Sequence, residues 1–209
     1  MIQEKKKKGF TLVEILVVIA LIGLLMGIFM VAIGSSRRNA KIRATKTLLK
    51  QLELALSNYQ SDFGTYPPSS LKDIGVTIEN SKNQGIESLV ACLFTQQKNG
   101  PYFKDYDSKR LTNYDKDKMP NFNDNLNKSG EALEYTDSWK EVLVYIHGRD
   151  YQDYQRVADY MGKKSYGFSI KPAMDPKTKN FFNPTTFQLW SVGPNGKNEN
   201  GRGDDVTAW

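Results

Sequence analysis

The sequence predicts an α+β protein with one long N-terminal helix packed on a small antiparallel β-sheet. Three observations predict this class: an apolar run over residues 10–34, an amphipathic stripe that continues to residue 63, and short strand-like segments after residue 138. At 209 residues, the chain is long enough for one domain with a proper hydrophobic core.

The net charge of +6 is unevenly distributed along the chain. Residues 1–9 hold four lysines and one glutamate, residues 10–46 hold five basic residues and Glu14, and residues 47–209 hold 20 basic and 21 acidic residues. The bulk of the chain therefore offers no positive field for a phosphate backbone, and we expect no nucleic-acid partner. A single cysteine and a single histidine exclude a Cys/His zinc site and an intrachain disulfide.

Residues 10–34 are predicted to form a membrane helix. The 20 residues from Ile15 to Gly34 carry no charge, which is enough to cross a hydrocarbon core of about 30 Å at about 1.5 Å per residue. A buried core helix is the alternative, but such helices are seldom this long and apolar on all sides. The block Lys5–Lys8 favours a cytoplasmic N-terminus, but Arg37, Arg38 and Lys41 lie just past the other end of the run. A secretory signal, which also begins with a basic block before an apolar run, is the alternative.

Glu14 is the one charged residue of this apolar run. A carboxylate at mid-membrane costs about 2.5–3.5 kcal/mol and calls for a cationic partner. The new α-amino group of Phe10 would supply that cation if the chain were cut after Gly9, with better geometry from a neighbouring chain than from its own. This interpretation predicts a polymer of parallel helices; an interfacial glutamate near lipid headgroups is the alternative.

Residues 35–63 are predicted to continue the same helix as an amphipathic half. Gly64 and the pair Pro67-Pro68 end the helical pattern. A separate coiled coil is the alternative, although the stripe is too short for several heptads. The stripe consists of Ala44, Leu48, Leu52, Ala55, Leu56, Tyr59 and Phe63.

The globular domain is predicted to cover residues 64–209. A second helix is expected at 83–95, with Ile86, Leu89, Val90 and Leu93 buried, and an irregular surface excursion at 104–136. Strands are expected at 139–147, 166–171 and 186–192. On this pattern Cys92 is a helix residue of modest burial, and His147 lies at a strand end without catalytic partners.

The C-terminal loop, 191–206, has the composition of a calcium site. Its glycines allow tight turns, and calcium takes six to eight hard oxygen ligands. An ordinary Gly/Asn hairpin loop is the alternative, and the spacing does not fit the EF-hand. The oxygen-bearing residues are Asn195, Asn198, Glu199, Asn200, Asp204 and Asp205.

Residues 5–25, from Lys-Lys-Lys-Lys-Gly-Phe-Thr-Leu-Val-Glu onward, resemble the class III signal and helix start of type IV pilins and type II secretion pseudopilins. The resemblance implies a pilin-like fold and a leader of residues 1–9, which a prepilin peptidase removes after Gly9 before methylating Phe10. It also implies that Glu14 neutralises the N-terminus of the neighbouring subunit during assembly.

The chain also resembles the major pseudopilins in its centre and at its end. The segments concerned are 84–90, 137–139, Gly193-Pro194-Asn195-Gly196, Asp204-Asp205-Val206 and Trp209, whereas regions near 100–135 and 148–164 look inserted. In that family the C-terminal loop binds calcium. The ligands expected here are Ser191, Asn195, Asp204 and Asp205, with Asn195 in place of the family's aspartate.

These resemblances imply a structural subunit rather than an enzyme. The expected protein is a single-pass protein of the bacterial inner membrane with a periplasmic domain. It polymerises into the pseudopilus of a type II secretion system, which drives the export of folded proteins. The implied partners are further copies of the chain, minor pseudopilins, the prepilin peptidase and the inner-membrane assembly platform. A type IV pilin for adhesion, motility or DNA uptake and, more remotely, a membrane-tethered enzyme are the alternatives.

Overall fold

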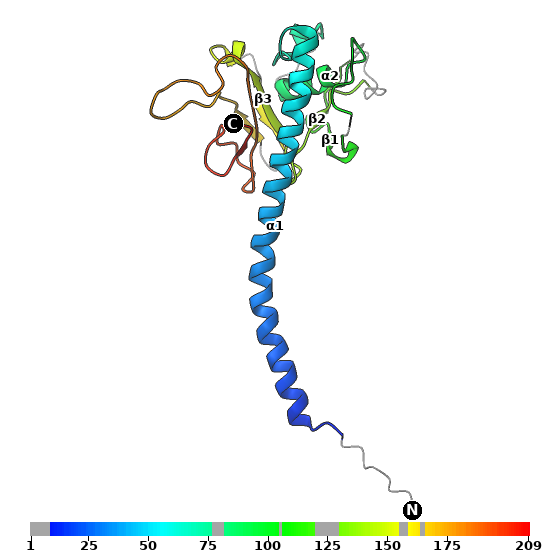
Figure 1. Cartoon of the computed structure of the whole chain (residues 1–209), viewed down its shortest axis with the longest axis vertical. Helices are drawn as coiled ribbons and strands as arrows, with labels where there is room; N and C mark the ends of the chain where they lie inside the picture. Colours follow the sequence, from blue (N-terminus) through cyan, green and yellow to red (C-terminus); the bar gives the residue numbers. More distant parts are fainter. Residues whose placement is uncertain (1–8, 77–81, 105, 120–129, 155–158, 164–165) are drawn as a thin grey trace, which may run out of the picture. The chain divides into compact units, whose positions relative to one another are not determined.

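The computed structural model describes residues 9–76, 82–104, 106–119, 130–154, 159–163 and 166–209. The chain divides into two compact units, Met1–Ala40 and Lys41–Trp209. One long helix is followed by a second helix and, among the described residues, three small antiparallel sheets (Figure 1). The predicted α+β class is therefore confirmed, and the arrangement is consistent with a pilin-like fold.

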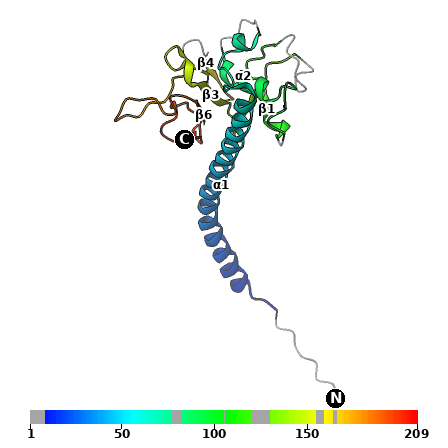
Figure 2. The same cartoon turned by 45° about the horizontal axis from the view of Figure 1, so that its top comes forward.

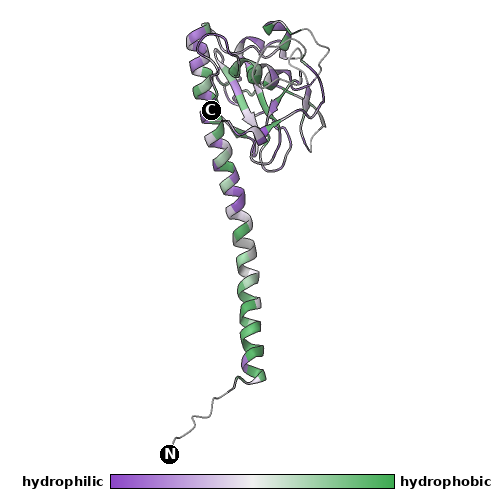
Figure 3. Cartoon of the chain, turned by 90° about the vertical axis from the view of Figure 1, so that its right-hand side faces the viewer, coloured by the Kyte–Doolittle hydropathy of each residue, from purple (hydrophilic) through white to green (hydrophobic). Residues whose placement is uncertain are grey.

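Helix α1 runs from Leu12 to Phe63, close to the predicted span. Figure 3 shows its first half coloured mainly hydrophobic and its second half as a mixture of hydrophobic and hydrophilic residues. The helix ends at Gly64 as predicted, since Gly64 adopts a left-handed φ of 78° and its N–H donates to Gln60 O at 2.8 Å. A residue with a Cβ is strained in that conformation, so glycine suits this position.

The second half of α1 buries a stripe of side chains in the core of the second unit. The predicted stripe is right from Leu48 to Tyr59, but Ala44 is exposed, and the neighbouring Thr45 is fully buried instead. The buried hydroxyl of Thr45 is satisfied because it donates to Ser138 Oγ at 3.0 Å. The buried apolar residues of this helix are Leu48, Leu49, Leu52, Ala55, Leu56 and Tyr59.

Helix α2, Gln84–Leu93, confirms the predicted second helix and its four buried residues. Cys92 is 4% exposed, so the expectation of modest burial was wrong. The reason is that α2 packs on β2 and β3 and shares one core with α1, which leaves it little solvent-facing surface. Asn83 fixes the start of α2, because its Nδ2 donates to Glu134 Oε1 at 2.9 Å and to Met161 O at 2.7 Å.

The central sheet contains β3 (Leu143–His147), β6 (Phe187–Ser191) and β7 (Val206–Thr207), all antiparallel. Strands β3 and β6 lie side by side (Figure 2). Every residue of both strands is buried, so both faces of this pair are covered. The predicted strand at 139–147 begins four residues later, because Asp137 Oδ1 accepts the N–H groups of Trp139 and Glu141 at 2.7 and 3.0 Å and holds a turn there.

Two further ribbons pair β1 (Leu111–Thr112) with β2 (Glu134–Tyr135), and β4 (Asp159–Met161) with β5 (Tyr166–Ser169). Short 3-10 helices occupy Leu71–Ile74 (η1), Ser108–Arg110 (η2) and Gly148–Asp150 (η3). The predicted insertions near 100–135 and 148–164 lie partly outside the described residues.

The expectation of a surface excursion at 104–136 was wrong for part of that segment. Met119, Ala132, Glu134 and Tyr135 are each at most 2% exposed. Apart from the short η2, β1 and β2, the described part of the segment is irregular, but these four side chains enter the core. Such anchors have neither helical nor strand periodicity, so the pattern gave no sign of them.

Candidate functional site

The predicted processing and assembly residues lie at the start of α1. Gly9 and Phe10 are exposed, and Phe10 is 81% exposed. Residues 1–8 of the predicted leader lie outside the described residues. The helix begins two residues after Phe10, so the predicted cleavage point directly precedes its first turn.

Glu14 forms a capping box with Thr11. The Glu14 Oε2 atom accepts the Thr11 backbone N–H and the Thr11 hydroxyl, both at 2.8 Å, and Thr11 Oγ1 accepts the Glu14 N–H at 3.2 Å. This reciprocal pair satisfies N–H groups that no earlier helical turn can accept. The sequence signal for this cap is the spacing Thr-x-x-Glu from residue 11 to residue 14.

Over the described residues, no helix is both long and apolar enough to cross a membrane.

The C-terminal loop connects β6 to β7 and is held by two tryptophans. Trp190 Nε1 donates to Asn198 Oδ1 at 3.1 Å, and the Trp209 ring packs edge-on to Trp190 with centroids 6.1 Å apart. Gly201 lies against the Trp209 ring so closely that a Cβ at this position would overlap it. The loop therefore packs against two tryptophan side chains, and these contacts position its polar atoms.

Three carboxylates meet in this loop. Single carboxylate oxygens of Glu199, Asp204 and Asp205 lie within 4.8 Å of one another. The Asp204 N–H donates to Glu199 Oε2 at 2.9 Å, and a Cβ at Gly203 would overlap the same Glu199 carboxylate. Gly203 also has a φ of 57°, which favours glycine, and a Cβ at this position would displace the Glu199 carboxylate.

Asp205 is the most constrained of the three. Its Oδ2 accepts the N–H groups of Glu199 and Gly201 at 3.1 and 2.8 Å, while its Oδ1 is buried with no hydrogen-bond partner. Burial raises the pKa of Asp205 to about 7, and the charges of Glu199 and Asp204 add to the rise. A buried oxygen without a partner, beside two more carboxylates, fits a site that a cation completes.

The structure brings together two of the four predicted ligands, Asp204 and Asp205. The third carboxylate is Glu199, which the sequence offered as one of six oxygen-bearing residues of the loop. Asn195 lies next to them, since its N–H donates to Asp204 Oδ2 at 3.2 Å, but its own Oδ1 accepts the Lys197 N–H at 2.6 Å. Ser191 has a different environment. Its hydroxyl donates to Asp137 Oδ2 at 2.5 Å and accepts the Gly193 N–H at 3.1 Å, which anchors the start of the loop.

A second group of carboxylates, from Glu87, Asp115 and Asp117, also has oxygens within 4.8 Å of one another. Glu134 lies beside it and is fully buried; its Oε2 accepts the Tyr114 N–H at 3.1 Å. Burial raises the pKa of Glu134 to about 8, and the charge of Asp115 adds to the rise. The sequence gives no sign of this group, because Glu87 on α2 lies far along the chain from Asp115 and Asp117.

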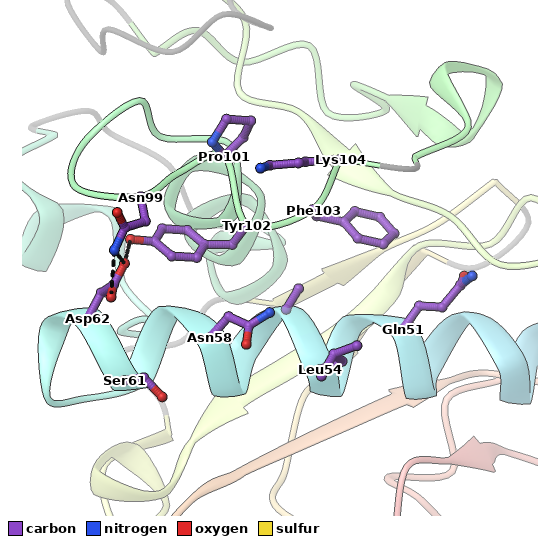
Figure 4. A pocket seen from close by; sticks show the side chains of 11 residues that line it. Gln51, Leu54, Asn58, Ser61, Asp62, Asn99, Pro101, Tyr102, Phe103 and Lys104 are labelled. Atoms are coloured by element: carbon purple, nitrogen blue, oxygen red, sulfur yellow. Dashed lines mark hydrogen bonds between the residues drawn. The ribbon is translucent and has the colours of Figure 1, made fainter.

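A groove of about 610 Å³ lies between α1 and the segment 99–104 (Figure 4). Asp62 closes one end, accepting the Tyr102 hydroxyl at 2.6 Å and the Asn99 amide at 3.0 Å. Leu54 lines the groove and is 66% exposed. The groove thus has polar side chains at one end and the exposed aliphatic side chain of Leu54 along its length.

Comparison with known proteins identifies the N-terminal segment. Residues 5–30 match the prokaryotic N-terminal methylation motif. Over 88 residues the chain is 32% identical to the type II secretion system core protein G of Pseudomonas aeruginosa, covering 42% of this chain and 53% of that protein. The chain thus spans about half the length of this curated relative, and no solved structure matches it. Both similarities confirm the resemblance to type II secretion pseudopilins.

Proposed function

We propose that this chain is a structural subunit of the pseudopilus of a type II secretion system. The observation that carries the proposal is the methylation motif over residues 5–30, together with the similarity to a type II secretion core protein G. In this proposal the chain is not an enzyme. It polymerises with its own copies on an inner-membrane assembly platform, with minor pseudopilins as further partners, and the filament drives the export of folded proteins through the periplasm.

In the proposed sequence of events, the prepilin peptidase cuts after Gly9, and Phe10 becomes a methylated N-terminus. The apolar run 10–34 anchors the subunit in the inner membrane until it is drawn into the filament. Glu14 Oε2 already accepts two hydrogen bonds from Thr11 in the single subunit. The negative charge of Glu14 then compensates the α-ammonium group of a neighbouring subunit, which would otherwise enter an apolar surrounding unpaired.

We further propose that the C-terminal loop binds calcium through Glu199, Asp204 and Asp205, with Asn195 beside them. The donors are hard oxygens, and the buried Oδ1 of Asp205 supports this assignment. When bound, a divalent cation supplies positive charge that offsets the repulsion among the three carboxylates. The packing of the loop on Trp190 and Trp209 positions these carboxylates before calcium binds. Bound calcium would then stabilise the folded subunit.

The assembly proposal is tested by expressing the full chain in cells that contain a type II secretion assembly system. Mass spectrometry of the N-terminus reports cleavage and methylation, and electron microscopy of sheared cells reports filaments. We expect Glu14→Ala and Glu14→Gln to be cleaved normally but to form no filaments. Because Glu14→Gln keeps an oxygen that can accept the Thr11 bonds, it separates the charge from the cap. Normal filaments from either variant would overturn the proposed role of Glu14, and uncleaved wild-type chain would overturn the proposed function.

A further inference from the structure

A cavity of about 310 Å³ lies between the segment 171–181 and the C-terminal loop. It shares Glu199 with the carboxylate cluster and is separate from the groove beside α1. Apolar side chains form much of its lining: Pro172, Ala173, Met174 and Phe181. Two cations, Lys171 and Arg202, line it as well, and both are exposed to solvent.

The backbone around this cavity is fixed by a buried glutamine. The Gln188 side chain, on β6, is fully buried; its Oε1 accepts the Ala173 N–H at 2.6 Å and its Nε2 donates to Ala173 O at 2.9 Å and Phe182 O at 2.8 Å. The Gln188 side chain thus makes to the backbone of Ala173 and Phe182 the hydrogen bonds that a neighbouring strand would otherwise make. The apolar wall is therefore held in place before any ligand arrives, which lowers the cost of binding.

The two basic residues are positioned at the cavity in different ways. Arg202 donates one guanidinium N–H to Met174 O at 3.1 Å, whereas the backbone N–H of Lys171 donates to Asn200 Oδ1 at 2.8 Å and so positions the main chain of Lys171. A guanidinium carries five N–H donors, so this single bond leaves Arg202 donors for an incoming acceptor. Within the described part of the chain, neither Lys171 nor Arg202 forms an ion pair within 4.0 Å.

Glu199 also lines the cavity, and its negative charge offsets part of the positive charge of Lys171 and Arg202. Its Oε2 accepts the Asp204 N–H at 2.9 Å, and its Oε1 lies 3.5 Å from Asn195 Nδ2, so both oxygens are bonded within the C-terminal loop. The cavity therefore combines an apolar interior with two cations and one carboxylate in its lining, which leaves an excess of one positive charge. A ligand complementary to it has an apolar body and one anionic end.

We propose that this cavity binds an apolar carboxylate, with the apolar body against Met174 and Phe181 and the carboxylate on Arg202 and Lys171. A cavity of about 150 Å³ accommodates benzene, so 310 Å³ holds an aromatic ring with a short carboxylate-bearing chain. A methionine sulfur and an aromatic ring also favour an aromatic body. The same chemistry occurs in a free small acid and in the C-terminal residue of a polypeptide.

The test is binding of phenylacetate to the full chain in detergent micelles, followed by the NMR signals of the methionine methyl groups. Phenylacetamide, its neutral counterpart, is the matched ligand control. We expect phenylacetate to shift the Met174 methyl signal with a Kd of about 1 mM, as suits a fragment-sized ligand, and phenylacetamide to bind at least about tenfold more weakly. Equal binding of the two probes, or no shift at Met174, would overturn the proposal.

Variants locate the binding groups. Arg202→Gln and Lys171→Gln should each weaken phenylacetate binding by about tenfold, whereas Lys177→Gln, at an exposed lysine of the same segment, should leave it unchanged. An unaltered Kd in Arg202→Gln would contradict the assignment. A tetrapeptide ending in phenylalanine is compared with its C-terminal amide. Tighter binding of the free-acid peptide than of phenylacetate identifies a polypeptide end as the source, and weaker binding identifies a small acid.

Discussion

Glu14 and Thr11 bond each other across the first turn of α1, with Glu14 Oε2 accepting both the N–H and the hydroxyl of Thr11 at 2.8 Å. The residue that is proposed to pair with a neighbouring subunit therefore already has a function within its own chain. The Thr11 bonds fix the direction of the carboxylate before assembly. This arrangement lowers the entropy that must be lost when the charge pair forms.

The Thr11 hydroxyl should affect the helix start more than assembly. In Thr11→Val the charge of Glu14 remains but the side-chain cap is lost, which costs about 1 kcal/mol. We expect the amide hydrogens of the first turn to exchange about fivefold faster in the full chain, with filaments still formed. Loss of filaments in Thr11→Val, to the extent seen for Glu14→Gln, would show that the cap and the charge are not separable.

Calcium should raise the melting temperature of the chain. If calcium at about 100 times its Kd stabilises the folded state by about 2.7 kcal/mol, the expected rise is about 5–11 °C. Asp204→Ala and Glu199→Gln should abolish most of this rise, whereas Asp175→Asn, outside the loop, should retain it. A calcium response that persists unchanged in Asp204→Ala means that the ligands lie elsewhere.

Gly203→Ala should act on the same site without removing a ligand. A Cβ at Gly203 overlaps the Glu199 carboxylate, and the φ of 57° strains any residue other than glycine. We expect weaker calcium stabilisation and a lower melting temperature in the absence of calcium. Gly130→Ala is the matched control, because Gly130 also has a positive φ, of 69°, but open space around its Cβ position. If Gly203→Ala and Gly130→Ala change the calcium-dependent rise in melting temperature equally, the close approach of Gly203 to Glu199 has no effect on the site, and the prediction is wrong.

Glu134 should make the fold less stable in alkaline solution. Because its pKa is raised to about 8, the folded chain holds a proton that the unfolded chain releases near pH 4.5. The stabilisation is complete below pH 4.5 and is lost as the pH rises to about 8. Glu134→Gln keeps an acceptor for Asn83, so its melting temperature should fall less between pH 5 and 9 than that of the wild type, by about 3 °C or more. Parallel curves for the two chains would refute this.

His147 should produce the opposite dependence. Its Nδ1 accepts the Arg149 N–H at 3.0 Å, and burial, followed by the charge of Arg149, lowers its pKa. The neutral, buried His147 side chain contributes its full share of the folding stability above about pH 6.5. That share is lost as the pH falls below this value, because the histidine of the unfolded chain takes up a proton first. His147→Asn offers an uncharged acceptor for the same N–H. Thermal melts at pH 7.5 and 5.5 should show a smaller loss for His147→Asn; an equal loss would assign the acid sensitivity to other groups.

Helix positions and buried faces were predictable where periodicity is strong. The end of α1 at Gly64 and the buried residues Leu89 and Leu93 of α2 follow from local patterns alone. The start of β3 did not follow, because a side-chain bond from Asp137 overrides the strand propensity of Trp139.

The candidate sites divide in the same way. Glu14 stands out in the sequence because a lone charge in an apolar run is conspicuous. Glu199 does not stand out from its polar neighbours in the loop, and only the left-handed turns that fold the loop bring it to Asp204 and Asp205. The cavity at Arg202 had no signal in the sequence, because it depends on the long-range bonds of Gln188.

The buried Cys92 has a practical consequence for labelling this protein. Its thiol is 4% exposed, and burial raises its pKa to about 12, so it stays protonated and shielded from alkylating reagents at neutral pH. It is also the single cysteine of the chain. Cys92 therefore need not be replaced before site-directed labelling. One engineered surface cysteine can carry a spin label, a fluorophore or a cross-linker while the core stays unchanged.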